Sequence, residues 1–166
     1  IGADGIKTGF LTVEQYSLAS SIKVNERRIT AVASGFKSKN SRSRESIKIL
    51  NWGLKKFDTI KVTKKNEVFT SLDVWVGKKD KVEIAPNEDY YLTIPKRKKK
   101  TIKAVIEYNG PIEAPISKGD KIGLLNIYVS GELKKEINIF SGETIKRANI
   151  FSRLLKSFNF LVWGDV

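Results

Sequence analysis

The stretch Asp4-Gly-Ile-Lys-Thr-Gly-Phe-Leu-Thr12 decides how the start of the chain is interpreted. Two runs rich in small and β-branched residues follow it, Tyr16–Val24 and Arg28–Ser34, with the polar residues 25–27 between them. Runs of this composition around a short polar turn predict two antiparallel strands. A sheet that begins near Lys7 is therefore the first element that we expect.

A helix is predicted to follow this sheet. After the polar stretch 37–43, apolar residues recur at the spacing of one helical face, and they are Ile47, Leu50, Leu54 and Phe57. Ser41 or Ser43 is expected to cap the helix, because serine is a favoured N-cap residue. The first 57 residues thus read as strands followed by a helix.

Residues 58–141 show a different pattern, in which short alternating runs are separated by turn signals such as Asn109-Gly-Pro111. Several short strands at this spacing predict a small β-sandwich or barrel. The runs are Glu67–Thr70, Leu72–Val76, Tyr90–Ile94, Ile102–Tyr108 and Gly123–Val129.

The segment from Gly142 to Trp163 is predicted to be an amphipathic helix with basic residues mostly off its apolar stripe. One apolar face beside lysines and arginines is typical of a helix that lies in a membrane interface. Packing of this helix on the β domain or on a partner is the alternative. The residues expected to form the anchor are Ile150, Phe151, Leu154, Leu155, Phe158, Leu161 and Trp163.

Composition excludes several kinds of site. The chain has no cysteine and no histidine, so disulfides, thiolate metal sites and histidine-based triads are ruled out. Acid–base chemistry must then use Lys, Tyr or carboxylates, and we expect neither a metal nor a cofactor. The net charge of +13 favours an anionic partner without identifying it.

The basic run Lys96-Arg-Lys-Lys-Lys100 admits two interpretations. It is either a nucleic-acid patch or, as we favour, a solvated turn between two strands. The tyrosines near it alternate as sheet residues do, so we expect no nucleic acid. Trp52 and Trp75 are interpreted as core residues.

Six segments, taken in order along nearly the whole chain, resemble the low-molecular-mass penicillin-binding proteins that act as D-alanyl-D-alanine carboxypeptidases. The Lys-Thr-Gly tripeptide alone is weak support, and the collinearity of all six is the specific signal. They are Asp4–Gly9, Leu18–Ser20, Leu50–Leu54, Tyr91–Pro95, Ala114–Ile116 and Lys121–Gly123.

The resemblance implies a role for each residue of the Lys-Thr-Gly strand. Lys7 would place positive charge beside the nucleophile and the substrate carboxylate, and Thr8 would hydrogen-bond that carboxylate. Gly9 would let the substrate backbone lie close to the strand. The backbone N–H of Phe10 would donate to the oxyanion. Peptidoglycan pentapeptide and β-lactams are the implied ligands, in the periplasm or on the outer face of the cytoplasmic membrane.

The nucleophile of that family lies in a Ser-x-x-Lys motif well before the Lys-Thr-Gly strand. Here Ser20-Ser-Ile-Lys23, Ser34-Gly-Phe-Lys37 and Ser38-Lys-Asn40 all follow Lys7, and we interpret them as chance matches. We therefore expect this chain to be part of a longer enzyme and to be inactive alone. The family's arginine near the carboxylate is also absent after Gly35, and whether Lys37 or a displaced Arg42 or Arg44 replaces it stays open.

We thus expect an α+β chain. Residues 1–57 would be the closing slice of a transpeptidase-like catalytic domain, residues 58–141 a β-sandwich domain, and residues 142–166 the anchor helix. The expected function is removal of the terminal D-Ala from peptidoglycan pentapeptide through an acyl-serine. The main alternative is a non-catalytic, membrane-associated binding module at the cell wall, and a basic nucleic-acid-binding β protein is a third.

Overall fold

The structure is a computed structural model that describes residues 2–150, 154 and 158. The chain forms two units, one made of residues 1–60 with 93–97 and the other of residues 61–92 with 98–166. Each unit is described by itself below.

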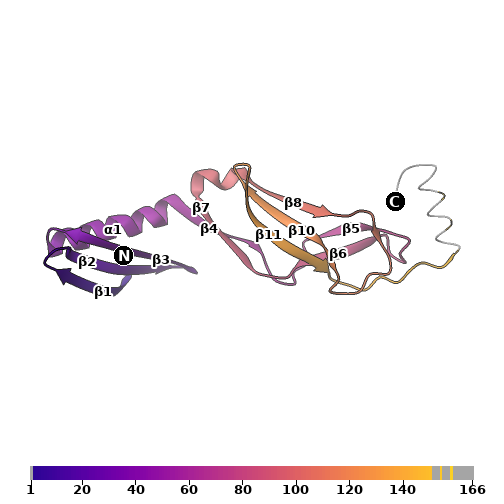
Figure 1. Ribbon diagram of the computed structural model, residues 1–166, viewed down its shortest axis with the longest axis horizontal. Helices are drawn as coiled ribbons and strands as arrows, with labels where there is room; N and C mark the ends of the chain where they lie inside the picture. The colour runs from indigo at the N-terminus through magenta and orange to yellow at the C-terminus, as the bar shows by residue number, and fades with distance from the viewer. Residues whose placement is uncertain (1, 151–153, 155–157, 159–166) are drawn as a thin grey trace. The chain divides into compact units, whose positions relative to one another are not determined.

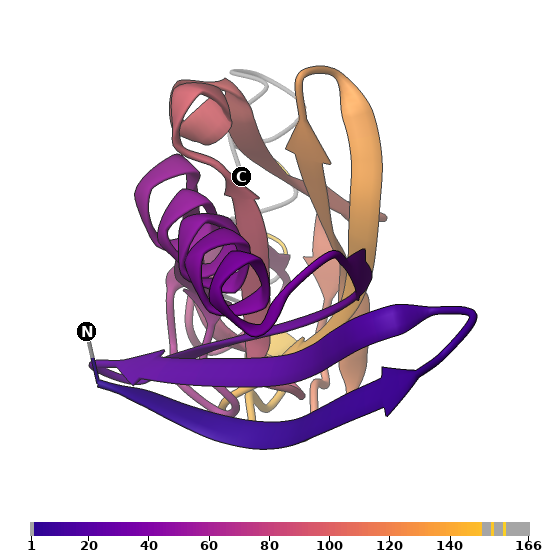
Figure 2. The same cartoon turned by 90° about the vertical axis from the view of Figure 1, so that its left-hand side faces the viewer.

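The first unit is a three-stranded antiparallel sheet covered by one helix (Figure 1). Strands β1 (Ala3–Leu11), β2 (Gln15–Val24) and β3 (Arg27–Phe36) pair in the order β1-β2-β3. Helix α1 (Lys39–Lys56) lies along this sheet, where it contacts β2 and β3 (Figure 2). The predicted order of strands and helix is therefore found in this unit.

The N-terminus of α1 is closed by a pair of serines. The Ser38 hydroxyl accepts a hydrogen bond from the Ser41 N–H, and the Ser41 hydroxyl accepts one from the Ser38 N–H. This reciprocal capping box satisfies two backbone donors at the helix start. The prediction of Ser41 or Ser43 as the cap is wrong, because Ser38 supplies the first acceptor and the helix starts earlier.

The C-terminal end of α1 is fixed to β3 by Arg27. Its guanidinium donates to the carbonyls of Gly53, over 2.9 Å, and Phe57, over 2.7 Å. Gly53 is buried against Ile29, whose Cδ1 lies 3.2 Å from where a Cβ at Gly53 would stand. The small residue therefore lets the helix approach the sheet closely.

The apolar stripe of α1 is only partly buried. Leu50 is 2% exposed, whereas Ile47 is 46% and Trp52 is 56% exposed. The indole of Trp52 meets the ring of Phe57 edge-on, with 5.0 Å between ring centroids. The interpretation of Trp52 as a core residue is therefore wrong, because its indole lies on the part of α1 turned away from β2 and β3.

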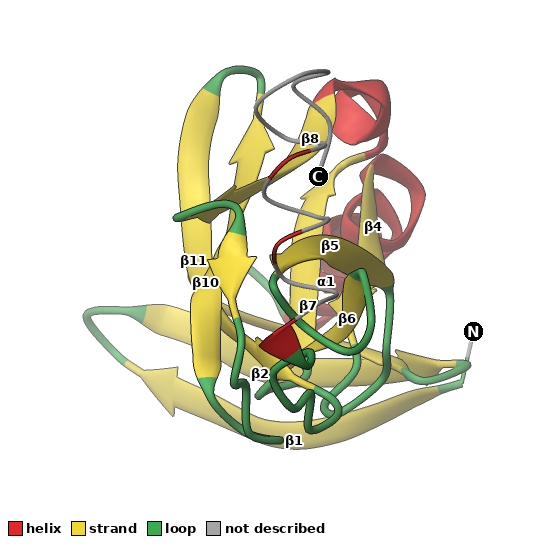
Figure 3. Ribbon diagram, turned by 90° about the vertical axis from the view of Figure 1, so that its right-hand side faces the viewer, coloured by secondary structure: helices red, strands yellow, loops and turns green. Residues whose placement is uncertain are grey.

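The rest of the chain is mostly strand (Figure 3). A six-stranded sheet has the order β8-β10-β11-β6-β5-β9, and a separate two-stranded ribbon joins β4 (Phe57–Thr63) to β7 (Tyr90–Pro95). A short 3-10 helix, η1 (Lys96–Thr101), links β7 to β8. The sheet strands are β5 Thr70–Trp75, β6 Lys81–Pro86, β8 Ile102–Tyr108, β9 Ile112–Glu113, β10 Lys121–Val129 and β11 Glu132–Ser141.

The core of the second unit follows from the two-residue period of its strands. Ile137 and Ile139 of β11 have no exposed surface, and Ile127 of β10 and Val82 and Ile84 of β6 are buried as completely. Because side chains alternate between faces along a strand, these residues line one side of the sheet. The described residues are mostly strand with one long helix, which confirms the predicted α+β class at this coarse level, and the transpeptidase-like slice and the two-sheet sandwich stay predictions.

Residues 142–149 are not helical, so the predicted helix start at Gly142 is wrong. The backbones of Ile116 and Ile145 exchange two hydrogen bonds, and Ile145 is 1% exposed. The Ala148 N–H donates to the Val76 carbonyl. This segment therefore continues the β unit, and its pairing with the strands outweighs its helical spacing.

Three of the predicted anchor residues are described, and all three are helical. Ile150, Leu154 and Phe158 are 72%, 65% and 65% exposed, and their four-residue spacing puts them on one helical face. The others, Phe151, Leu155, Leu161 and Trp163, lie outside the described residues. Among the residues that were described, no helix has the length and apolar character needed to cross a membrane.

Candidate functional site

The Lys-Thr-Gly segment lies on β1, at the edge of the first sheet. Within the described chain β1 pairs with β2 and has no other strand beside it. Lys7 stands opposite Ala19 and Gly9 opposite Ser17, whereas Thr8 and Phe10 alternate with them on the other face. An edge strand leaves half of its backbone N–H and C=O groups without a sheet partner, so β1 offers such groups to a ligand.

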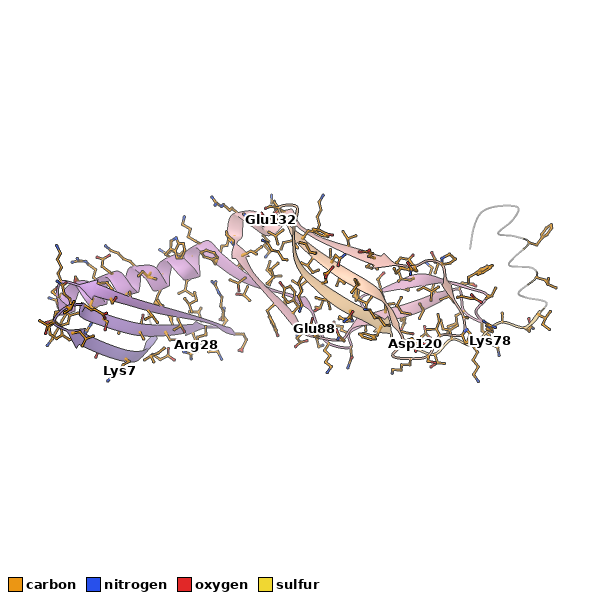
Figure 4. The ribbon with its side chains drawn as sticks, viewed as in Figure 1. Lys7, Arg28, Lys78, Glu88, Asp120 and Glu132 are labelled. Carbon is orange, nitrogen blue, oxygen red and sulfur yellow. The ribbon has the colours of Figure 1, made fainter. Side chains whose placement is uncertain are left out.

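The side chains of this segment are open to solvent. Lys7 and Thr8 are exposed, and Phe10 is 58% exposed. Figure 4 shows the Lys7 side chain projecting from the outer side of β1, away from α1. No ion pair holds Lys7 within the described part of the chain. Its ammonium therefore remains available to an anionic group.

A break in the strand register comes directly before Lys7. Gly5 pairs with Ser20 and Lys7 with Ala19, so Ile6 is an extra residue with no partner on β2. Such a bulge bends a strand and redirects the side chains that follow it. The direction of Lys7 is thus set by the local backbone as well as by the alternation of the strand.

Gly9 has a close neighbour across the sheet, the side chain of Ser17. A Cβ built at this position would lie 2.5 Å from the Ser17 hydroxyl oxygen, closer than non-bonded atoms approach. The family resemblance implies that Gly9 leaves room for substrate. The structure adds that Gly9 leaves room for Ser17 across the sheet.

An aromatic pair and an arginine adjoin the end of this segment. The rings of Phe10 and Tyr16 pack with centroids 4.7 Å apart, and the Arg42 guanidinium lies 5.8 Å from the Tyr16 centroid. Arg42 Nε is buried and has no hydrogen-bond partner within the described chain. Buried donors are normally paired, so Arg42 has a donor for which the described chain supplies no acceptor. Sequence reasoning left this arginine undecided.

A polar cluster fixes the other end of β1. Arg28 on β3 donates to the Asp4 carboxylate over 2.7 Å and to the Ser21 hydroxyl over 2.6 Å. The hydrogen bond from Arg28 lowers the pKa of Asp4 below its usual value. These contacts join all three strands on the face that carries Lys7.

The three Ser/Lys motifs that follow Lys7 do not form a nucleophile site. Ser20 lies on β2 and its hydroxyl reaches the Ala31 carbonyl at 3.5 Å. Lys23 is three residues further along the same strand and so points to the opposite face. Ser34 lies on β3 and Lys37 beyond its end, and Ser38 caps α1 with its side chain. These placements agree with their interpretation as chance matches.

Comparison with known proteins gives matches over both units. Residues 57–147 match the family described as penicillin-binding protein 5, C-terminal domain. The chain is similar to the D-alanyl-D-alanine carboxypeptidase DacA of Escherichia coli K12, with 30% identity over 156 residues. That alignment covers 93% of this chain and 39% of the relative. DacA of Haemophilus influenzae is 31% identical over 93% of this chain and 40% of its own length.

The solved structures to which the chain is similar come from the same group of proteins. The chain is similar to penicillin-binding protein 5 from Haemophilus influenzae, with a TM-score of 0.66 and 29% identity, over 89% of this chain and 43% of that one. The carboxypeptidase DacD from Francisella tularensis matches with a TM-score of 0.64 and 30% identity, over 89% of this chain and 37% of that one. The chain thus spans about two fifths of the length of these relatives.

Proposed function

Because this chain belongs to the family of penicillin-binding protein 5, with that family's C-terminal domain at residues 57–147, we propose that it is part of a serine-type D-alanyl-D-alanine carboxypeptidase. The complete enzyme would remove the terminal D-Ala of peptidoglycan pentapeptide on the outer side of the cytoplasmic membrane. The observation that carries this proposal is the exposed Lys7-Thr8-Gly9 segment on the open edge of β1.

In this proposal β1 forms one wall of the catalytic cleft. The substrate peptide lies along the open edge, and the Thr8 hydroxyl hydrogen-bonds its terminal carboxylate. The serine oxygen attacks the carbonyl of the penultimate D-Ala, the terminal D-Ala leaves as the amine is protonated, and water then hydrolyses the acyl-serine. Lys7 supplies positive charge, and the Phe10 N–H stabilises the oxyanion.

Arg42 is the residue that we propose in place of the family's arginine near the carboxylate. It comes from the first turns of α1, and its contact with Tyr16 holds it beside the strand pair that ends at Phe10. Its unpartnered Nε supports this assignment over Lys37, because a guanidinium donates two parallel hydrogen bonds to a carboxylate.

The serine itself is proposed to lie in a segment that precedes this chain. Within the chain Ser20 and Lys23 point to opposite faces of β2, and Ser34 lies on β3, so neither of these serines stands at a helix start. Labelled penicillin is therefore expected to form no covalent adduct with the 166-residue polypeptide, as read by mass spectrometry. An adduct on this polypeptide would refute the assignment.

A Thr8→Val substitution in the longer gene product tests the role of the strand. The substitution removes the hydroxyl at nearly constant volume, so binding of a peptide with a terminal carboxylate should weaken. A peptide with a terminal carboxamide lacks the charged acceptor and should be affected less. The expected result is a fall in the preference for carboxylate over carboxamide by about tenfold or more. An unchanged preference would contradict the role of Thr8.

The exposed apolar residues near the C-terminus support a second proposal, attachment to a membrane surface. Ile150, Leu154 and Phe158 share one face, and none of them is covered in the structure. Such a face beside basic residues suits insertion between anionic headgroups. This feature favours a membrane-associated binding module as the alternative function, and an absence of D-Ala release by the longer gene product would select that alternative.

A further inference from the structure

A groove in the first unit lies apart from β1, β2 and β3. It has a volume of about 530 Å³ and is lined by Trp52, Lys55, Lys56 and Phe57 from the end of α1 and the start of β4, together with Pro95, Lys96 and Arg97. The groove therefore joins the end of α1 to the first residues of the basic run. This run, for which the sequence favours a solvated turn, forms the 3-10 helix η1 between β7 and β8.

The charges of this groove are all of one sign. Its four ionisable lining residues are basic, and no carboxylate lines it. Lys55, Lys56, Lys96 and Arg97 are exposed, and none of them takes part in an ion pair within the described chain. Four unpaired cations around one concavity repel one another and attract an anion.

The groove also offers an aromatic surface. Trp52 is 56% exposed, and its contact with the edge of Phe57 fixes the indole. An exposed, oriented indole provides a flat apolar face on which the C–H face of a sugar ring can stack. The Arg97 guanidinium suits the planar geometry of a carboxylate. Together these groups fit a ligand that has both a ring and an acid.

We propose that this groove binds an acidic polysaccharide, with one sugar ring on Trp52 and its carboxylates on the surrounding lysines and Arg97. Its volume falls within the range of about 300–1,000 Å³ that is usual for ligand pockets. The proposed cell-wall setting makes an acidic glycan an available occupant, and in this respect the inference rests on the proposed function. The site would hold the enzyme on its polymer independently of the strand that carries Lys7.

Two other anionic partners fit the groove less well. Single-stranded nucleic acid is usually bound by several aromatic rings in succession along a basic channel, whereas here the second ring, Phe57, is turned edge-on to the first. A lipid surface is flat on this scale and favours a broad apolar face, whereas this site is concave. We therefore propose neither of these partners, and the test below measures the binding of both.

The test is calorimetric titration of the 166-residue chain with a tetramer of galacturonic acid. Its fully methyl-esterified form has the same rings without the charges and should bind at least about tenfold more weakly. Trp52→Ala should weaken binding of the acid form by about fivefold, and Trp52→Phe should retain most of it. The double variant K96Q/R97Q, on the exposed 3-10 helix, should weaken it about tenfold.

Lys121→Gln is the matched control, because it removes one exposed lysine from β10 and should leave binding unchanged. Equal affinity for the acidic and esterified tetramers, or no effect of both Trp52→Ala and K96Q/R97Q, would overturn the proposal. Tighter Trp52-dependent binding of a thymidine oligonucleotide, or of vesicles with anionic headgroups, would also overturn it. No D-Ala release is measured here, so failure of this site leaves the assignment of β1 intact.

Discussion

At the scale of single residues, Arg27 at the start of β3 contributes strongly to the stability of the first unit, because it connects β3 to the end of α1. Its guanidinium binds two carbonyls at the end of α1, where the helix dipole is negative. One side chain thus satisfies two acceptors and ties α1 to the sheet that carries Lys7. The placement of the candidate site depends on this tie, because β2 and β3 pack against the same helix.

Arg27→Ala is expected to lower the free energy of unfolding of the first unit by about 2–4 kcal/mol, because two charge-assisted hydrogen bonds are lost. Hydrogen exchange of the amides of α1 measures this effect. Arg28→Ala is the control, since its pair with Asp4 is exposed and should contribute little. Equal protection of α1 in the two variants would contradict the role of Arg27.

The placement of some residues could be predicted from the sequence, and the placement of others could not. The exposure of Lys7 and Thr8 agrees with their expected place on a strand open to a ligand. The contact of Arg42 with Tyr16 depends on how α1 lies on the sheet, and no local pattern encodes it. The exposure of Trp52 was also missed. It depends on which face of α1 lies against the sheet, and large aromatic residues are on average well buried.

At the scale of elements, the strands predicted best were those in which β-branched, aromatic and other apolar residues form a short run between turn signals. β8 has the bounds that were predicted, and β7 and β10 contain their predicted runs. β6 and the whole of β11 were missed, although the apolar residues of β6 alternate with lysine and glutamate as strand residues do. The segment 142–149 was misassigned because its pairing with distant strands is a tertiary effect.

Ile139→Ala on β11 tests whether this strand forms the centre of the second unit. Ile139 has no exposed surface, so the truncation leaves a cavity and should lower the free energy of unfolding by about 2–5 kcal/mol. Leu133→Ala on the same strand removes a side chain that is 46% exposed and should cost less than half as much. Urea unfolding followed by circular dichroism compares the two, and similar losses would show that β11 is not central.

At the scale of the whole molecule, three parts of the chain have different proposed roles. We propose that β1 forms one wall of the catalytic cleft and that the apolar face at Ile150, Leu154 and Phe158 contacts the membrane, and the β unit lies between these two segments in the sequence. The first part rests on exposed groups at a sheet edge, and the last on an exposed helical face.

Truncation after Ala148 should abolish binding to vesicles that contain anionic lipid, as measured by flotation. This end point keeps Ile145 and its pairing with Ile116, so the β unit should stay folded. Leu154→Ser with Phe158→Ser in the full chain should weaken binding, whereas Leu133→Ser on β11 should not. Unchanged flotation after the truncation would reject the membrane contact.

The most direct test of the account is the rate at which fluorescent penicillin acylates the gene product that carries this chain after the segment proposed to precede it. The account predicts an adduct on a serine of a preceding Ser-x-x-Lys motif, and a rate at least roughly a hundredfold lower in Lys7→Ala. Lys23→Ala, which removes an exposed lysine from β2, should react at the unaltered rate. Absence of such a serine upstream, or full-rate acylation of Lys7→Ala, would contradict the account.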